Sequence, residues 1–115
     1  MATLLIVDDE KDIVSALEIY LKPEGYEILT ANSGKQAVDI IHRERVDLIL
    51  MDIMMPEMDG YQATSKIREE SNVPIIFLTA KSEDTDMILG LNIGADDYIT
   101  KPFNPAEVIA RVRSC

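Results

Sequence analysis

Short apolar runs alternate with longer amphipathic segments along the whole chain. Five runs are rich in aliphatic and β-branched residues, and we predict a strand at each: Thr3–Val7, Tyr26–Ala31, Leu48–Met51, Pro74–Thr79 and Asp97–Thr100. The first, third and fourth runs are continuously apolar, which is typical of parallel strands covered on both faces. The second run has an alternating pattern, which favours a less deeply covered position at the edge of a sheet.

Helical patterns lie between these runs. The first covers roughly Asp12–Leu21, where Ile13, Leu17 and Leu21 belong to one apolar stripe. Four further helix starts are indicated by Ser33 with Gln36, Asp59 with Gln62, Ser82 with two acids after it, and Asn104-Pro105 with Glu107. Gly25 and Gly94 stand where glycines that end helices are expected.

Five successive β-α units predict an α/β domain with an open parallel sheet and helices on both faces. By analogy with known folds, we expect a flavodoxin-like (βα)5 three-layer sandwich with the strand order 2-1-3-4-5, in a single domain over residues 1–115. The last helical pattern runs through Ile109 and Val112 to the chain end without a stop signal. We therefore expect a longer protein to continue beyond it.

Composition and charge restrict the function classes. The net charge of −10 argues against direct nucleic-acid binding by this domain, because phosphate contacts need clustered Lys and Arg. No apolar run approaches the ~18 residues of a membrane span. The start has no charged n-region or cleavage site, so we expect no signal peptide. The single cysteine, Cys115, excludes an intrachain disulfide. A cytoplasmic protein is expected, with the acidic surplus serving either solubility or a cation site.

Polar residues follow the predicted strands at the rim where open α/β sheets bind ligands. Asp8 and Asp9 follow the first strand, Asp52 the third, and Thr79 and Lys101 stand at the ends of the fourth and fifth. Three carboxylates near one point repel, so either some are protonated or a cation lies among them. Asp9 and Asp52 could bind Mg²⁺ directly and Asp8 through water. Alternatively, Asp9 could simply cap the first helix.

The Asp52 carboxylate could attack phosphorus and form an acyl phosphate. The Thr79 hydroxyl could then donate a hydrogen bond to a phosphoryl oxygen, and the Lys101 ammonium could pair with another. Taken singly, each of these three residues is better explained as the boundary of a strand or as a turn residue. Their coincidence on successive strand ends favours a site. The Met54 backbone carbonyl is close enough in sequence to reach the same cation.

Four motifs together resemble the two-component response-regulator receiver family over nearly the whole chain. They are the stretches 6–10 (IVDDE), 52–60 (DIMMPEMDG), 79–80 (TA) and 94–103 (GADDYITKPF). The resemblance implies that Asp52 is the phosphoacceptor and that Asp8, Asp9, Asp52 and the Met54 carbonyl bind Mg²⁺ or Mn²⁺. It implies that Thr79 and Lys101 contact the phosphoryl group, that Tyr98 is a switch aromatic, and that the Lys101–Pro102 bond is cis.

The same resemblance implies a signalling domain that assists its own phosphorylation and dephosphorylation, with a sensor histidine kinase as its partner. The motif at 94–103 is most like regulators with a C-terminal winged-helix DNA-binding domain, which would be absent from this chain. Such regulators dimerise on phosphorylation. The residues that match that dimer face are Ile88, Leu91, Asp97, Ile109 and Arg111, with Asp97 and Arg111 paired across the interface. Met87 and Asn92 replace expected charges, which predicts a weak dimer.

Two other classes compete with the signalling switch. A phosphatase of the haloacid-dehalogenase type would place a second acid two residues after the nucleophile, where this chain has Met54. A flavin-binding flavodoxin-like protein would need a loop rich in glycine and hydroxyl groups after the first strand, where this chain has three acids that repel phosphate. No Walker motif or G-x-G-x-x-G pattern supports nucleotide binding.

Overall fold

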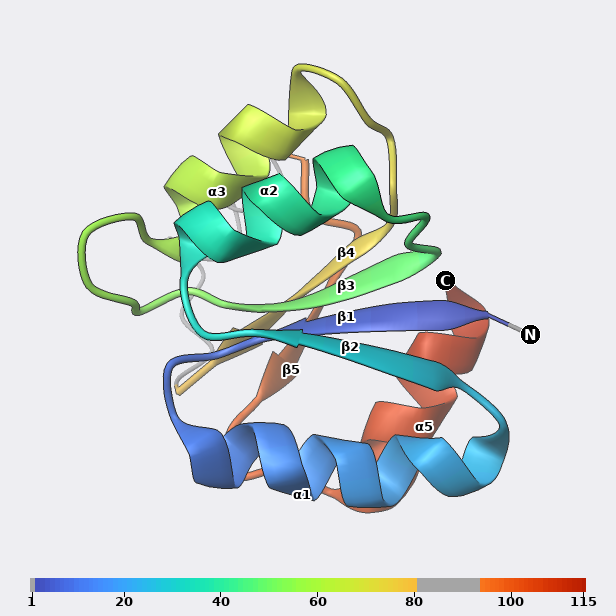
Figure 1. Cartoon of the computed structure of the whole chain (residues 1–115). Helices are drawn as coiled ribbons and strands as arrows, with labels where there is room; N and C mark the ends of the chain where they lie inside the picture. The colour runs from blue at the N-terminus through green and yellow to red at the C-terminus, as the bar shows by residue number, and fades with distance from the viewer. Residues whose placement is uncertain (1, 81–93) are drawn as a thin grey trace.

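Five parallel strands form one sheet in the order β2-β1-β3-β4-β5 (Figure 1). This computed structural model describes residues 2–80 and 94–115. The strands are β1 (Thr3–Val7), β2 (Glu27–Ala31), β3 (Leu48–Asp52), β4 (Ile75–Thr79) and β5 (Asp97–Thr100). The predicted fold class and strand order are confirmed, and so is the edge position of the second run.

The strand bounds differ from the prediction at single residues. β3 extends through Asp52, because that residue pairs with Leu78 of β4. β4 begins at Ile75 instead of Pro74, since proline has no N–H for the ladder, although the Pro74 carbonyl still accepts from the Ile49 N–H at 2.9 Å. Asp52 therefore lies inside the sheet, at its carboxyl edge.

The described helices follow the strands with short connections. They are α1 (Lys11–Leu21), the 3-10 helix η1 (Lys22–Glu24), α2 (Gly34–Arg43), α3 (Gly60–Arg68) and α5 (Pro105–Ser114). The helix predicted to begin at Ser82 lies outside the described residues. None of the helices described in residues 2–80 and 94–115 is long and apolar enough to cross a membrane.

Side-chain oxygens at the helix starts show why the helices begin where they do. Asp59 and Gln62 form the predicted capping box, with bonds of 2.8 and 2.9 Å. Ser33 accepts from the Gln36 N–H, but the Gln36 side chain reaches Asn32 instead, so only half of that predicted box forms. The N-cap residue of α1 is Glu10, without a side-chain bond, so Asp9 does not cap this helix.

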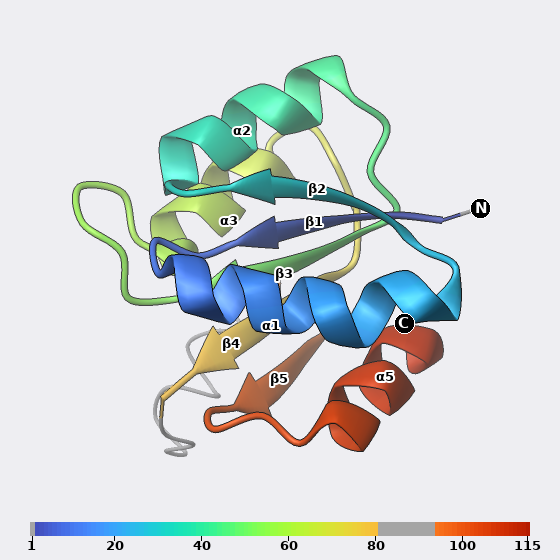
Figure 2. The same cartoon turned by 60° about the horizontal axis from the view of Figure 1, so that its bottom comes forward.

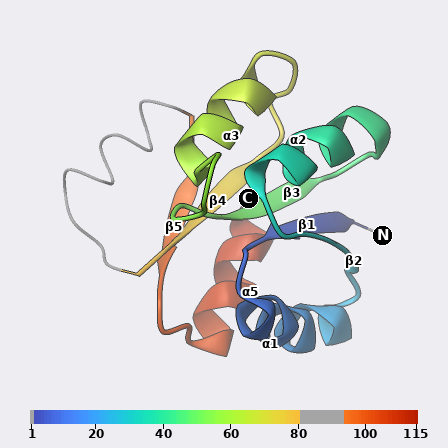
Figure 3. The ribbon, with the colours of Figure 1, turned by 60° about the vertical axis from the view of Figure 1, so that its left-hand side comes forward.

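The helices cover the sheet in two layers, α2 and α3 on one face and α1 and α5 on the other (Figures 1, 2 and 3). Successive strand residues face opposite sides. Leu5, Ile49 and Phe77 belong to the core beneath α2 and α3, whereas Leu4 and Leu50 belong to the core beneath α1 and α5. The continuous apolar runs thus serve two cores at once, which fixes the carboxyl edges of β1, β3, β4 and β5 relative to one another.

Candidate functional site

The carboxyl ends of the three central strands and of β5 bring the predicted residues to one rim. In the ladder between β1 and β3, Val7 pairs with Met51, so Asp8 and Asp52 follow at equivalent positions. Thr79 pairs with Thr100 at the end of the β4–β5 ladder. The Lys101 N–H then donates to the Thr79 carbonyl at 2.7 Å. This backbone bond holds the start of the Lys101 loop against the end of β4.

A single ammonium group joins two buried carboxylates. Asp8 is 1% exposed and Asp52 is 4% exposed. Lys101 Nζ donates to Asp8 Oδ2 at 3.3 Å and to Asp52 Oδ1 at 3.2 Å. The peptide bond between Lys101 and Pro102 is cis, as predicted. The sequence led us to expect Lys101 beside a phosphoryl group, and the structure adds that it pairs with Asp8 and Asp52 together.

The surroundings make both carboxylates harder to ionise. Burial raises the pKa of Asp52 most, the negative charge of Asp8 raises it further, and Lys101 only partly opposes them, so the pKa lies at about 6 against an ordinary 3.8. Burial also raises the pKa of Asp8, against the Glu10 N–H and Lys101, which lower it. Burial lowers the pKa of Lys101, but Asp52 and Asp8 outweigh it and raise that pKa overall.

The oxygens on the β1 side of the rim fit a hard divalent cation. Carboxylate oxygens of Asp8, Asp9 and Glu10 lie within 4.8 Å of one another, with Asp9 and Glu10 exposed. Mg²⁺ prefers oxygen ligands and keeps several waters, which an open acidic rim allows. Asp8 and Asp9 are thus brought together as predicted. We did not single out Glu10 from the sequence, although its place as a third consecutive acid was the available signal.

Asp52 lies across the Lys101 bridge from this acidic group. Met54 follows it by two residues and is 78% exposed. The part of Asp52 and of the Met54 carbonyl in binding a cation remains a prediction.

Thr79 and Tyr98 occupy neighbouring strands behind the rim. Thr79 is 8% exposed at the end of β4. Tyr98, also 8% exposed, packs edge-on against Phe77 with ring centroids 5.8 Å apart. Phe77 in turn contacts Tyr61 of α3 at 5.4 Å. Tyr98, which the resemblance implies is a switch aromatic, is therefore buried against the core in this structure, and its role as a switch remains a prediction.

The predicted dimer face is described only in part, and the structure shows one of its pairs within a single chain. Arg111 Nη1 lies 2.9 Å from both carboxylate oxygens of Asp97 within the same chain, and the pairing of these residues across an interface remains a prediction. The two residues lie on α5 and β5, which pack together, so the pair also closes inside one molecule. Ile109 is half-buried against the chain's own core. Ile88 and Leu91, with Met87 and Asn92, lie outside the described residues.

Comparison with known proteins agrees with this geometry. Residues 4–113 match the family described as the response regulator receiver domain. The chain belongs to this family. It is a receiver domain of a two-component system, which is a signalling domain. Membership favours the signalling switch over the phosphatase and flavin alternatives.

Solved receiver structures are similar over nearly their whole length. The Vibrio cholerae chemotaxis protein CheY4 has 32% identity and a TM-score of 0.95, covering 99% of this chain and 98% of that one. A two-component response regulator from Clostridium difficile has 32% identity and a TM-score of 0.94, covering 99% and 94%. The receiver domain of the sensor histidine kinase PA1611 from Pseudomonas aeruginosa has 37% identity and a TM-score of 0.90, covering 98% and 95%. The PA1611 receiver domain holds a magnesium ion in its active-site cleft.

Proposed function

We propose that this receiver domain is a phosphorylation-dependent switch in which Asp52 accepts a phosphoryl group from a sensor histidine kinase. The observation that carries the proposal is the buried pair of Asp52 and Asp8 bridged by Lys101, at 3.2 and 3.3 Å. Such a pair concentrates two negative charges and one positive charge at the rim, where a charged ligand can rearrange them.

The transfer requires an ionised nucleophile. With a pKa of about 6, Asp52 is mostly ionised at neutral pH. One Asp52 oxygen attacks phosphorus, the bond from phosphorus to the donor atom breaks, and the donor leaves with that electron pair. The product is an acyl phosphate. Lys101, already within reach of Asp52, pairs with a phosphoryl oxygen, and the Thr79 hydroxyl donates to another.

The acidic rim supports a metal as the cofactor. Asp8, Asp9, Asp52 and the Met54 carbonyl would hold Mg²⁺ or Mn²⁺, whose charge would offset the repulsion between the carboxylates and an incoming phosphoryl group. The PA1611 receiver, with its magnesium ion, supports this assignment.

The proposed output passes from Asp52 through Thr79 and Tyr98 to the face expected of β5, α5 and the helix predicted to begin at Ser82. We propose that this face controls an effector, and the resemblance of residues 94–103 favours a winged-helix DNA-binding domain. The match to known families, over residues 4–113, is to a receiver domain throughout. A cytoplasmic location suits this role, because Cys115 stays reduced there and a kinase can reach the site.

Intact-mass spectrometry tests the proposal. Wild-type protein treated with acetyl phosphate and Mg²⁺ should gain one phosphoryl group, and excess chelator should suppress the gain. Asp52→Asn should gain none, whereas Asp39→Asn, a change at an exposed aspartate of α2, should behave like wild type. Equal labelling of Asp52→Asn and wild type would refute the assignment, and undiminished labelling in chelator would refute the metal requirement.

A further inference from the structure

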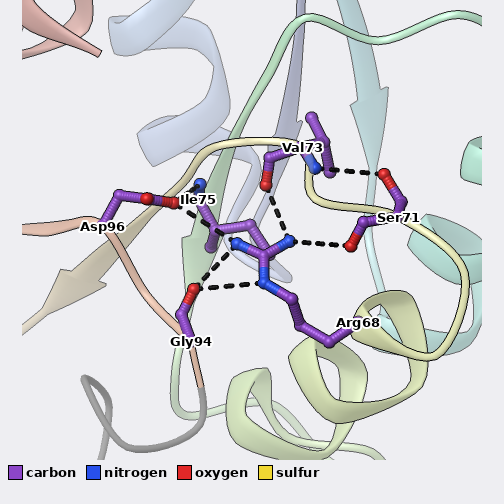
Figure 4. A network of polar contacts seen from close by, with 6 residues as sticks. All are labelled: Arg68, Ser71, Val73, Ile75, Gly94 and Asp96. Carbon is purple, nitrogen blue, oxygen red and sulfur yellow. Dashed lines mark hydrogen bonds and ion pairs between the residues drawn. The ribbon is translucent and has the colours of Figure 1, made fainter.

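Arg68, the last residue of α3, holds together three parts of the chain at the edge of the sheet opposite the phosphorylation site (Figure 4). Its Nη1 donates to the carbonyls of Ser71 and Val73 at 3.3 and 2.8 Å. Its Nε and Nη2 donate to the Gly94 carbonyl at 3.2 and 2.7 Å. Nη2 also lies 3.3 Å from Asp96 Oδ2. The side chain is 19% exposed, so these bonds are largely shielded from water.

The acceptors on the far side of Arg68 belong to Gly94 and Asp96, in the segment that leads into β5. Asp96 Oδ2 accepts from the Ile75 N–H at 2.8 Å, and the Asp96 N–H donates to the Ile75 carbonyl at 2.8 Å. Gly94 has φ +119°, and a Cβ added there would lie 2.9 Å from Arg68 Nε. Only glycine fits beneath the guanidinium in this conformation. Arg68 and Asp96 therefore fix where the chain enters β5.

The other end of α3 rests on the backbone of the phosphoacceptor. The Gly60 N–H donates to the Ile53 carbonyl at 2.8 Å. A Cβ added at Gly60 would lie 2.8 Å from Ile53 Cα and would also collide with the Asp52 carbonyl oxygen. A helix of nine residues is about 13 Å long. α3 thus spans the distance from Asp52 to the start of β5 as one rigid element, with a bonded contact at each end.

Besides Arg68, side-chain contacts also hold β5, including the pair of Asp97 with Arg111 of α5. β5 is an edge strand, and among the described strands it pairs only with β4. Tyr98 lies within it and Lys101 follows it directly. A displacement at its start would therefore reach Tyr98 and Lys101, two of the residues that the proposed switch uses.

We propose that Arg68 is a positioning residue through which α3 carries the phosphorylation state of Asp52 to the start of β5, in addition to the route through Thr79. This inference rests on the proposed function, because it assumes that Asp52 is the group that changes state. The coupling requires that the free energy of local opening at the start of β5 differ between the phosphorylated and the unphosphorylated state of Asp52.

Amide hydrogen exchange of Ile75 and Asp96 measures that opening, because their N–H groups join β4 to the start of β5. Beryllofluoride with Mg²⁺ serves as the phosphoryl mimic. In wild type, the mimic should change the exchange rates of these two amides by at least about fivefold. In Arg68→Gln the change should fall below about twofold, while the Ile53 amide, next to Asp52, keeps its wild-type response.

The ratio of the amide exchange rates with and without the mimic distinguishes a coupling role of Arg68 from a purely structural role. A purely structural Arg68 would speed exchange equally in both states and leave the ratio unchanged, which would overturn the inference. Asp47→Ala is the matched control, since the Asp47 carboxylate accepts from the Thr3 N–H at the start of β1 as Asp96 does at β4. It should speed exchange at Thr3 and preserve the ratio at Ile75 and Asp96.

Two further variants keep the test decisive. Arg68→Lys retains the charge but loses the forked donor set, and the ratio should be intermediate. If Arg68→Gln does not fold, Asp96→Asn keeps an oxygen for the Ile75 N–H, weakens the pair with Arg68, and should reduce the ratio. If the mimic changes exchange at Ile53 in the wild-type protein but not at Ile75 and Asp96, this inference is overturned and the proposed function is not. A wild type that shows no response at any amide and gains no phosphoryl group would overturn the proposed function with it.

Discussion

Asp52 carries its charge where both burial and the neighbouring Asp8 oppose it. The folded protein binds the Asp52 proton more tightly than the unfolded chain does, because the pKa rises from 3.8 to about 6 on folding. Stability is therefore lost as the pH rises through that interval and stays low above it. At about 1.4 kcal/mol for each pH unit, the loss is about 3 kcal/mol. The folded protein is less stable by this amount, but it holds a reactive, basic carboxylate at the site.

The variant Asp52→Asn should therefore be more stable than wild type at pH 7 in the presence of a chelator, by up to about 3 kcal/mol. Asparagine removes the repulsion with Asp8, and Lys101 keeps Asp8 as its partner. The advantage should shrink as the pH falls from about 6 toward 3.8, where Asp52 is neutral in both states. Urea unfolding at several pH values measures this difference. Equal or lower stability of the variant at pH 7 would contradict the electrostatic description of the site.

At the scale of elements, α3 begins directly behind Asp52, and a capping box holds its start. The capping box satisfies two N–H groups at its start, those of Asp59 and Gln62. Asp59→Ala should lower the free energy of unfolding by about 1 kcal/mol. Ser33→Ala, which removes the single capping bond of α2, should have a similar or smaller effect. Urea denaturation compares the two, and an unchanged midpoint for Asp59→Ala would show that the box does not stabilise α3.

Strands and caps were predictable because their signals are local. Apolar runs in β1, β3 and β4 and the Asp59–Gln62 spacing act through neighbours in the sequence, and the structure confirms them. The strand order came from analogy, since the pattern of one chain does not specify which strands pair. Arg68 was missed because its acceptors lie at 71, 73, 94 and 96, and only the fold brings residues 94 and 96 to it.

In the candidate site, too, local signals predicted where the residues lie but not which partners they contact. Asp8, Asp52 and Lys101 were found because parallel strands place their carboxyl ends at one edge, so a position just after a strand predicts a position in space. The partners of each charge were not predictable in this way. Side-chain geometry decides that Lys101 bridges two carboxylates and that Arg111 folds back on Asp97 of its own chain.

At the scale of the whole molecule, the pair of Asp97 and Arg111 bears on the proposed dimer. The pair is already formed within one chain at 2.9 Å. Exchanging it for the same pair across an interface would contribute only about 0–1 kcal/mol. Most of the affinity would therefore have to come from apolar contacts such as Ile109.

We accordingly expect the phosphoryl mimic to produce a weak dimer that dissociates on dilution. Sedimentation equilibrium with and without beryllofluoride measures it, over a wide range of protein concentration. A reducing agent must be present, because the exposed Cys115 could otherwise form a disulfide-linked dimer. Arg111→Gln should weaken the dimer only slightly. A mass that does not change with the mimic at any concentration would count against phosphorylation-driven dimerisation.

The location of the phosphoryl group is the most direct test of the central claim. Borohydride reduces an aspartyl phosphate to homoserine, and trypsin then releases residues 46–66, which contain Asp47, Asp52 and Asp59. After treatment with acetyl phosphate and Mg²⁺, sequencing of this fragment by mass spectrometry should find homoserine at position 52 and unmodified aspartate at 47 and 59. Homoserine at another position, with Asp52 unmodified, would contradict the assignment of Asp52 as the phosphoacceptor.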